Sequence, residues 1–221
     1  MNATSADRAW TYAGLLIALF AIPAASLVFK LAGFTRADSG AVVVRELVVL
    51  LLVGLLLWIV RAREKLPYSS IGLKREPFGW FVLWTVVSFL AFAAAVFVAL
   101  GVLLPALGLT YGTSAGPAVS LGVTLLVVLR AGVAEEVFYR GFAIERLEAL
   151  TGSRALAATV PLVMFAAFHF NQGLAGILIA FCVGAVATAI YLWKRNLVIL
   201  IAAHFLIDFI PNILIPLITG D

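Results

Sequence analysis

The sequence AWTYAGLLIALFAIPAASLVF at residues 9–29 contains no charged side chain. A transmembrane helix needs about 20 consecutive apolar residues, so this stretch is long enough to cross a bilayer. Arg8 before it and the small residues at 24–26 are also features of a signal peptide, but the apolar core of a signal peptide has only about 7–15 residues. The length therefore favours a spanning helix that is retained in the mature protein.

The whole 221-residue chain is similarly apolar, with 64% hydrophobic and only 12% charged residues. So few charged side chains cannot cover the surface of a soluble domain, and most of the chain is expected to lie in lipid. A net charge of +4 can indicate nucleic acid binding, but the basic residues are scattered among apolar runs. We therefore expect a membrane protein that contacts the lipid bilayer and no nucleic acid. Cys182 is the only cysteine, which excludes a disulfide bond within the chain.

The same length criterion predicts seven spanning helices along the chain. Strand alternation is absent, and the apolar runs exceed the roughly 9–11 residues of a barrel strand. No repeat or low-complexity linker divides the sequence. The expected fold class is all-α, a polytopic transmembrane helical bundle of about seven spanning helices, and residues 1–221 are expected to form a single membrane domain. The expected spans are approximately residues 10–34, 41–62, 78–104, 119–144, 155–170, 173–193 and 197–218.

The distribution of Lys and Arg predicts how the bundle is oriented in the membrane. Residues 61–75 carry five basic side chains, whereas residues 106–119 carry none. Because cytoplasmic loops have an excess of Lys and Arg, the connection between the second and third spans is expected inside the cell. We therefore expect a multi-pass protein of the cell membrane with a cytoplasmic amino terminus and with Asp221 outside. Lys30 and Arg36, which fall in the first outer loop, do not support this orientation for the first helix alone.

Four charged residues interrupt the expected fourth span: Arg130, Glu135, Glu136 and Arg140. Each charge at a helix centre opposes membrane insertion by about 2.5–3.5 kcal/mol, so this helix must face protein or water. On an α-helix, residues four apart share a face and residues five apart do not. Glu136 and Arg140 are therefore expected to form a buried structural ion pair, which leaves Glu135 free. An isolated pair of this kind can also serve only to hold helices together.

The only two histidines, His169 and His204, both lie in apolar segments. His204 and Asp208 are four residues apart, so they share a helix face and lie about 6 Å apart along the axis. Counting about 1.5 Å per residue from the nearest inner Arg places Glu135 about 16 Å deep, His169 about 22 Å, His204 about 14 Å and Asp208 about 20 Å. These four candidate catalytic residues can therefore meet near the middle of the bilayer. They are also a candidate zinc-ligand set, although no HExxH spacing is present.

These residues form three motifs in order: EEVFYR at 135–140, FAAFH at 165–169 and HFLID at 204–208. They are similar to the EExxxR, FxxxH and HxxxN/D motifs of the CAAX-processing and bacteriocin-processing family (CPBP, or Abi) of intramembrane proteases, which includes the type II CAAX prenyl endopeptidase. The resemblance defines a motif core at about residues 119–218, and IGLKR at 71–75 is similar to a short segment often seen ahead of it.

The resemblance implies an intramembrane endopeptidase that hydrolyses peptide bonds of a membrane-associated polypeptide, such as a prenylated protein or a leader peptide. It also implies that Glu135 and His169 activate a water molecule, while His204 and residue 208 face the oxyanion. Many members have Asn where this chain has Asp208. Because an ionised carboxylate cannot donate a hydrogen bond, Asp208 must be protonated to stabilise an oxyanion, or it has another role.

Two other classes of protein fit the same residues. A proton-coupled transporter would use the Glu, His and Asp side chains as a relay, and it would show ion-dependent flux without cleavage products. A non-catalytic membrane scaffold or bacteriocin-immunity protein would use these charges only to hold helices and a partner together. Such a protein would retain full function after the substitution Glu135→Gln.

Overall fold

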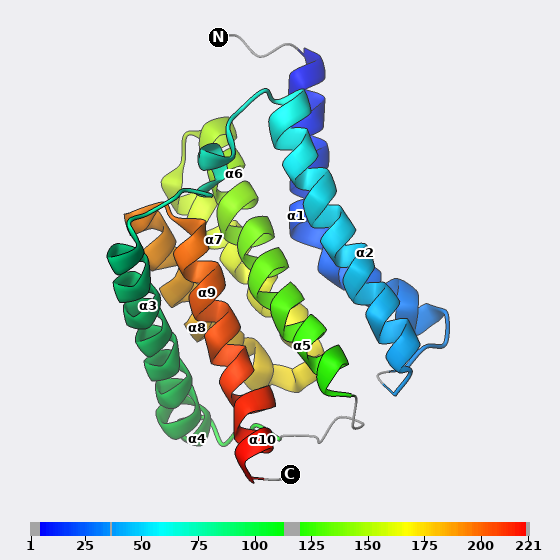
Figure 1. The fold of residues 1–221 in the computed structure, drawn as a ribbon, viewed down its shortest axis with the longest axis vertical. Helices are drawn as coiled ribbons and strands as arrows, with labels where there is room; N and C mark the ends of the chain where they lie inside the picture. The colour runs from blue at the N-terminus through cyan, green and yellow to red at the C-terminus, as the bar shows by residue number, and fades with distance from the viewer. Residues whose placement is uncertain (1–4, 36, 113–119, 220–221) are drawn as a thin grey trace.

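The computed structural model describes residues 5–35, 37–112 and 120–219, and the regular elements in these residues are all helical (Figure 1). The long helices run side by side along the long axis of the molecule, with the first two as an antiparallel pair at one side. Four stretches, η1, η3, η4 and η6, are π-helical, and η2 and η5 are 3-10 turns. The elements in chain order are α1 (Ser5–Leu31), α2 (Ser39–Trp58), η1 (Ile59–Arg63), η2 (Tyr68–Ile71), α3 (Phe78–Val98), η3 (Ala99–Leu103), α4 (Leu104–Ala106), α5 (Leu121–Arg130), η4 (Ala131–Ile144), α6 (Glu145–Thr151), α7 (Arg154–Ala167), η5 (Phe168–Gln172), α8 (Gly173–Lys194), α9 (Leu197–Phe209), η6 (Ile210–Leu214) and α10 (Ile215–Thr219).

The predicted class, an all-α membrane bundle, is confirmed, but fewer spans qualify than the sequence predicts. Among the described residues, five helical runs are long and apolar enough to cross a membrane. Two of the expected spans, 155–170 and 173–193, fall within one of these runs, in which α7 and α8 pack against each other. The expected span at 119–144 is not among the five, because it carries too many charged residues. The five runs are Arg8–Leu31, Ser39–Arg63, Phe78–Ala106, Arg154–Lys194 and Leu197–Thr219.

Each of the three helices that carry the sequence motifs begins at a residue that caps it. The side-chain oxygen of Ser120 accepts a hydrogen bond from the Val123 backbone N–H at the start of α5. Ser153 caps α7 in the same way, and Asn196 accepts from the Val198 N–H at the start of α9. Such caps satisfy backbone donors that a helix start leaves without partners, so they define where each motif helix begins.

The charged helix formed by α5 and η4 lies inside the bundle, where α1, α7 and α9 pack around η4 (Figure 1). Glu136 and Arg140 are each only 1% exposed. This burial keeps their charges away from lipid, where each charge would oppose membrane insertion. Gly132 permits the close approach of α9, because a Cβ atom at this position would lie 3.2 Å from the Ile201 carbonyl oxygen and the Phe205 nitrogen.

The connection between α2 and α3 folds back into one end of the bundle, which we call the closed end. Ile71 is fully buried there, and the Gly72 carbonyl accepts a 2.7 Å hydrogen bond from the Leu197 N–H at the start of α9. Arg146 of α6 contacts Glu64 at 2.8 Å and donates to the backbone and side-chain oxygens of Ser70. The IGLKR segment noted in the sequence therefore acts as a packed connection.

A second ion-pair group stabilises the closed end. Arg195 follows α8 and contacts Glu145 at 2.8 Å and Glu148 at 2.6 Å, both from α6. Burial lowers the pKa of the Arg195 guanidinium, but hydrogen bonds to the two carboxylates outweigh it and raise this pKa above its ordinary value. Tyr191 also donates a 2.7 Å hydrogen bond to Glu145. The start of α6 is thus fixed to the end of α8.

Candidate active site

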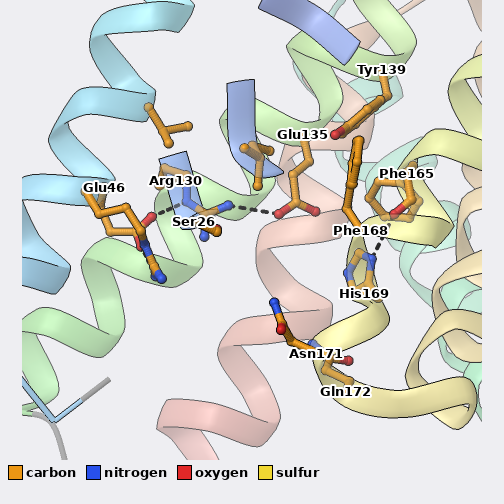
Figure 2. A pocket seen from close by; sticks show the side chains of 13 residues that line it. Ser26, Glu46, Arg130, Glu135, Tyr139, Phe165, Phe168, His169, Asn171 and Gln172 are labelled. Atoms are coloured by element: carbon orange, nitrogen blue, oxygen red, sulfur yellow. Dashed lines mark hydrogen bonds and ion pairs between the residues drawn. The ribbon is translucent and has the colours of Figure 1, made fainter. Parts of the chain in front are cut away.

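The Glu135 side chain is held by an arginine that lies five residues before it. Arg130 Nη1 donates a 2.9 Å hydrogen bond to Glu135 Oε1, and Arg130 Nε donates to the Glu46 carboxylate of α2 (Figure 2). The sequence analysis left Glu135 free because Arg140, five residues after it, points in a different direction on an α-helix, and it did not consider Arg130 as a partner. From residue 131 the helix is π-helical, with hydrogen bonds between residues five apart, and this geometry lets the two side chains meet.

Glu136 has two partners rather than one. Its Oε1 atom accepts from Arg140 Nη1 at 3.0 Å, so the two residues form the ion pair that their spacing predicts. The same oxygen lies 2.8 Å from His204 Nδ1, a contact that the sequence analysis did not foresee. The Arg140 guanidinium also lies 4.2 Å from the centre of the Phe165 ring. Glu136 therefore links η4 to α9, while Arg140 packs against α7.

The contact with Glu136 determines how the His204 ring is directed. A carboxylate can only accept, so His204 Nδ1 carries the hydrogen of this bond. The other ring nitrogen, Nε2, lies 3.8 Å from Glu135 Oε2 and 3.6 Å from Asp208 Oδ2. Three of the four predicted catalytic residues, Glu135, His204 and Asp208, are thereby brought together around this nitrogen.

The fourth residue, His169, lies in η5 and reaches the site across a cavity of about 150 Å³. Its Nδ1 atom lies 2.9 Å from the Phe165 carbonyl oxygen, which can only accept, so Nδ1 carries a hydrogen. In the neutral ring, Nε2 is then the acceptor. Glu135 and His169 both belong to the cavity wall, whereas His204 and Asp208 do not line it (Figure 2).

The cavity wall includes residues that the sequence analysis did not select. Glu46 is fully buried. The sequence could have indicated this residue, because a carboxylate inside an apolar span opposes membrane insertion and so needs a partner. The buried Tyr139 hydroxyl has no hydrogen-bond partner among the described residues. Apart from Arg130 and the motif residues Glu135, Phe165 and His169, no sequence pattern marks the remainder of the wall. The lining residues are Ile22, Ser26, Arg45, Glu46, Val49, Arg130, Glu135, Tyr139, Phe165, Phe168, His169, Asn171 and Gln172.

The candidate zinc-ligand set does not form a metal site in this arrangement. Structural and catalytic zinc sites need three or four nitrogen, sulfur or oxygen ligands that converge on one point. Within residues 5–35, 37–112 and 120–219, no group of three or more His, Cys, Asp or Glu side chains is placed to hold a metal ion. The mechanism below therefore includes no step that depends on zinc.

The fold and these contacts define a multi-pass helical membrane protein in which two carboxylates and an imidazole meet beside a cavity. Residues 117–210 match the family model described as type II CAAX prenyl endopeptidase Rce1-like. This part of the chain, which includes all three motifs, is similar to that family of proteases, and the resemblance seen in the motifs is confirmed. No curated protein and no solved structure matches the chain.

Proposed function

We propose that the protein is an endopeptidase of the cell membrane that hydrolyses a peptide bond of a membrane-associated polypeptide, with Glu135 as the general base. One observation carries this proposal. The Glu135 side chain lines a cavity together with His169 and, at the same time, lies 2.9 Å from Arg130 and 3.8 Å from His204. A base, a second imidazole and a cationic partner thus surround one place where a water molecule fits.

The first step is attack by water on the scissile carbonyl carbon. A single water needs roughly 10–15 Å³ of cavity space, and the cavity of about 150 Å³ also leaves room for part of a peptide. Glu135 takes one proton from the water, and His169 Nε2 accepts a hydrogen bond from the other O–H. The proton held by Glu135 then passes to the leaving nitrogen as the carbon–nitrogen bond breaks.

The negative charge on the carbonyl oxygen requires a hydrogen-bond donor. His204 does not line the cavity, but its Nε2 atom lies 3.8 Å from Oε2 of Glu135, which does. It supplies the donor when both ring nitrogens carry hydrogen and the carbonyl oxygen reaches past Glu135, since Nδ1 is held by Glu136. Asp208 lies 3.6 Å from the same Nε2 atom, so as a carboxylate it orients this ring instead of donating to the oxyanion. In this mechanism Asp208 therefore has a role other than oxyanion stabilisation, namely to orient the His204 ring.

Arg130 acts as a positioning residue in this mechanism. A buried carboxylate needs a partner of opposite charge, and Arg130 provides one for both Glu46 and Glu135. The guanidinium group fixes Glu135 on the cavity side of the helix and leaves its Oε2 atom directed toward His204.

The test is incubation of purified protein with a cellular membrane proteome, followed by mass spectrometry of newly formed peptide termini. We expect cleavage by the native protein and a loss of about 100-fold or more for Glu135→Gln, because general-base catalysis contributes about 10²–10⁴-fold. Glu145→Gln, at the closed end, is the matched control and should still cleave. Dialysis against a chelator should leave cleavage unchanged.

Near-native cleavage by Glu135→Gln contradicts the assignment of the general base. A protein that shows no cleavage products but retains its cellular function after Glu135→Gln is a scaffold or immunity protein. Chelator-sensitive cleavage that returns with zinc contradicts the metal-free route.

A further inference from the structure

Lys194, the last residue of α8, lies between two tryptophan rings at the closed end. Its Nζ atom is 3.4 Å from the centre of the Trp84 ring of α3 and 4.0 Å from the centre of the Trp193 ring. The two rings meet edge to face, with their centres 4.9 Å apart and their planes at 85° to each other. Because an ammonium group is attracted to the face of an indole ring, these contacts fix the position of the Lys194 charge. We call Trp84, Trp193 and Lys194 the Lys194 cluster.

The side chains of the Lys194 cluster offer hydrogen-bond donors and no acceptor. A lysine ammonium group carries three donors, and each indole ring carries one. Within the part of the chain that the structure describes, these donors have no hydrogen-bond or ion-pair partner. The next residue differs, since Arg195 contacts both Glu145 and Glu148. The charge of Arg195 is thus balanced within the protein, whereas that of Lys194 is available to an anion.

The cluster faces away from the interior of the bundle. Trp193 is 67% exposed, and none of the three residues lines the active-site cavity. Trp80, one turn before Trp84 on α3, is 55% exposed and stacks on it with the ring centres 6.5 Å apart. Tryptophan rings are enriched where a membrane meets water, at the level of the lipid headgroups. The Lys194 charge is therefore expected beside the headgroup phosphates.

The same arrangement occurs a second time at the closed end, between α1 and the end of α2. The Arg63 guanidinium lies 4.4 Å from the centre of the Trp10 ring and 5.7 Å from that of the Trp58 ring. These two rings also meet edge to face, at 81° and with their centres 5.5 Å apart. In Figure 1 the α1–α2 pair and the α3–α8 pair lie on opposite sides of the bundle. A cation over two perpendicular indole rings on each side indicates a feature of the membrane interface rather than one local contact.

The charge distribution indicates which leaflet the cluster meets. Basic residues gather at the closed end, and an excess of Lys and Arg marks the cytoplasmic side. The cytoplasmic leaflet carries anionic lipids, and basic pockets between transmembrane helices on this side bind anionic headgroups. The Lys194 cluster has this position, because α3 and α8 pack against each other. The basic residues at the closed end are Arg61, Arg63, Lys65, Lys74, Arg75, Arg146, Arg154, Lys194 and Arg195.

We propose that the Lys194 cluster binds the headgroup of an anionic phospholipid such as phosphatidylglycerol. The ammonium group forms a charge-assisted hydrogen bond with a phosphate oxygen, and the indole rings contact the glycerol backbone and the first acyl carbons. A zwitterionic headgroup is disfavoured, because Lys194 repels its ammonium group and covers one face of each ring. The bound lipid then bridges α3 and α8 at the closed end. This site does not depend on the proposed peptidase activity.

The test is native mass spectrometry of the full chain in a neutral detergent, with phosphatidylglycerol or phosphatidylcholine added at equal concentration. The native protein should bind phosphatidylglycerol about 5-fold more tightly, the effect of one basic residue at a membrane surface. Lys194→Gln should remove this difference, and Lys194→Arg should keep it, because a guanidinium group also binds phosphate. Lys74→Gln is the matched control, since it removes one exposed charge at the same end and should bind like the native protein.

A second variant tests the rings without disturbing buried packing. Trp193→Ala changes an exposed side chain, and the loss of one cation–π contact should weaken phosphatidylglycerol binding about 2–5-fold. Melting temperatures measured without added lipid check that each variant is folded.

Equal binding of phosphatidylglycerol by the native protein and Lys194→Gln overturns the proposal, and so does an equal loss in Lys74→Gln. If Lys194→Gln does not fold, native-like binding by Trp193→Ala overturns the proposal instead. A native protein that binds the two lipids equally overturns the selectivity for anionic headgroups.

Discussion

The two ends of the bundle use the same residue types differently. At the closed end, Arg146 and Arg195 contact carboxylates directly, and the chain packs tightly around them. At the opposite end, which we call the open end and where α1 meets α2, Arg45 and Lys30 border cavities. Farther inside the bundle, the buried Tyr139 hydroxyl has no partner among the described residues. Polar groups with satisfied hydrogen bonds stabilise a fold, whereas groups that face a cavity remain available to a ligand. Changes at the closed end should therefore affect stability, and changes at the open end should affect activity.

The largest stability effect is expected at the closed end for Arg146→Ala. This change leaves the Glu64 carboxylate, only 5% exposed, without its cationic partner. Removing one member of a buried ion pair costs about 3–5 kcal/mol, so folded yield and melting temperature in detergent should fall sharply. The control is Arg75→Ala, an exposed position at the same end, which should stay within about 0.5 kcal/mol of the native protein. Equal stability of the two variants would show that the Arg146 contacts contribute nothing.

A second comparison uses two glycines with nearly the same backbone conformation. Gly72 at the closed end has φ +80°, and Gly33 at the open end has φ +82°. Alanine at either position strains the backbone by about 1–2 kcal/mol. At Gly72, a Cβ atom would also lie 2.8 Å from Tyr191 Cε2, whereas nothing lies within 4 Å at Gly33. This overpacking should add about 1–3 kcal/mol to Gly72→Ala alone.

The melting temperatures of Gly72→Ala and Gly33→Ala, measured side by side, separate strain from packing. If both variants lose the same stability, the close contact with Tyr191 is relieved at no cost, and the closed end is less rigid than its contacts indicate.

Two buried tyrosines provide a test that sorts stability from activity. Tyr191 donates a 2.7 Å hydrogen bond to Glu145 at the closed end. Tyr191→Phe should destabilise the protein by about 1.5–3 kcal/mol, because a hydrogen bond to a charged group is lost. Tyr139→Phe removes a hydroxyl without a partner among the described residues, so stability should be unchanged or slightly higher, while peptide cleavage falls several-fold because Tyr139 belongs to the wall of the active-site cavity. Thermal melts and the cleavage assay are measured on both variants. A stable Tyr191→Phe, or a Tyr139→Phe that cleaves like the native protein, contradicts the role given to that tyrosine.

Much of the fold could be predicted from the sequence, because long apolar runs in lipid have few structural solutions other than helices. The number of helical runs long and apolar enough to cross a membrane could not be predicted in this way. The span expected at 119–144 carries too many charges to qualify, and its charged residues Arg130, Glu136 and Arg140 are accommodated by burial among other helices. The spans expected at 155–170 and 173–193 correspond to α7 and α8, which the turn η5 joins into one helical run, and the chain turns back at Gly173, where φ is +71°.

The candidate site was predictable to the extent that its contacts follow helical periodicity. The pair Glu136–Arg140 and the neighbours His204 and Asp208 are each four residues apart, and both contacts are present. The environment of Glu135 was not predictable in this way, since the α-helical periodicity assumed for it does not hold in the π-helical stretch.

Contacts between distant segments also escaped the sequence analysis. The bond between Arg130 and Glu46 joins residues 84 positions apart, and that between His204 and Glu136 joins residues 68 apart. No local pattern records such pairings. A charged residue in an apolar span indicates that it has a partner, but only the packed bundle shows which residue the partner is.

The smallest effect is expected for an ion pair at the closed end that remains partly in water. Arg195 and Glu148 are 2.6 Å apart, but their side chains are 26% and 31% exposed. Such pairs contribute about 0.2–1 kcal/mol and are weakened by salt, so Glu148→Gln should lower the melting temperature only slightly, and less at 1 M salt than at low salt. Arg195 also retains its contact with Glu145, which limits the loss further. The matched comparison is Glu64→Gln. The Glu64 carboxylate pairs with Arg146, whose side chain is only 7% exposed, so the loss of stability in this variant should be large and insensitive to salt. If both variants lose the same stability and respond equally to salt, burial does not explain the difference between these two ion pairs.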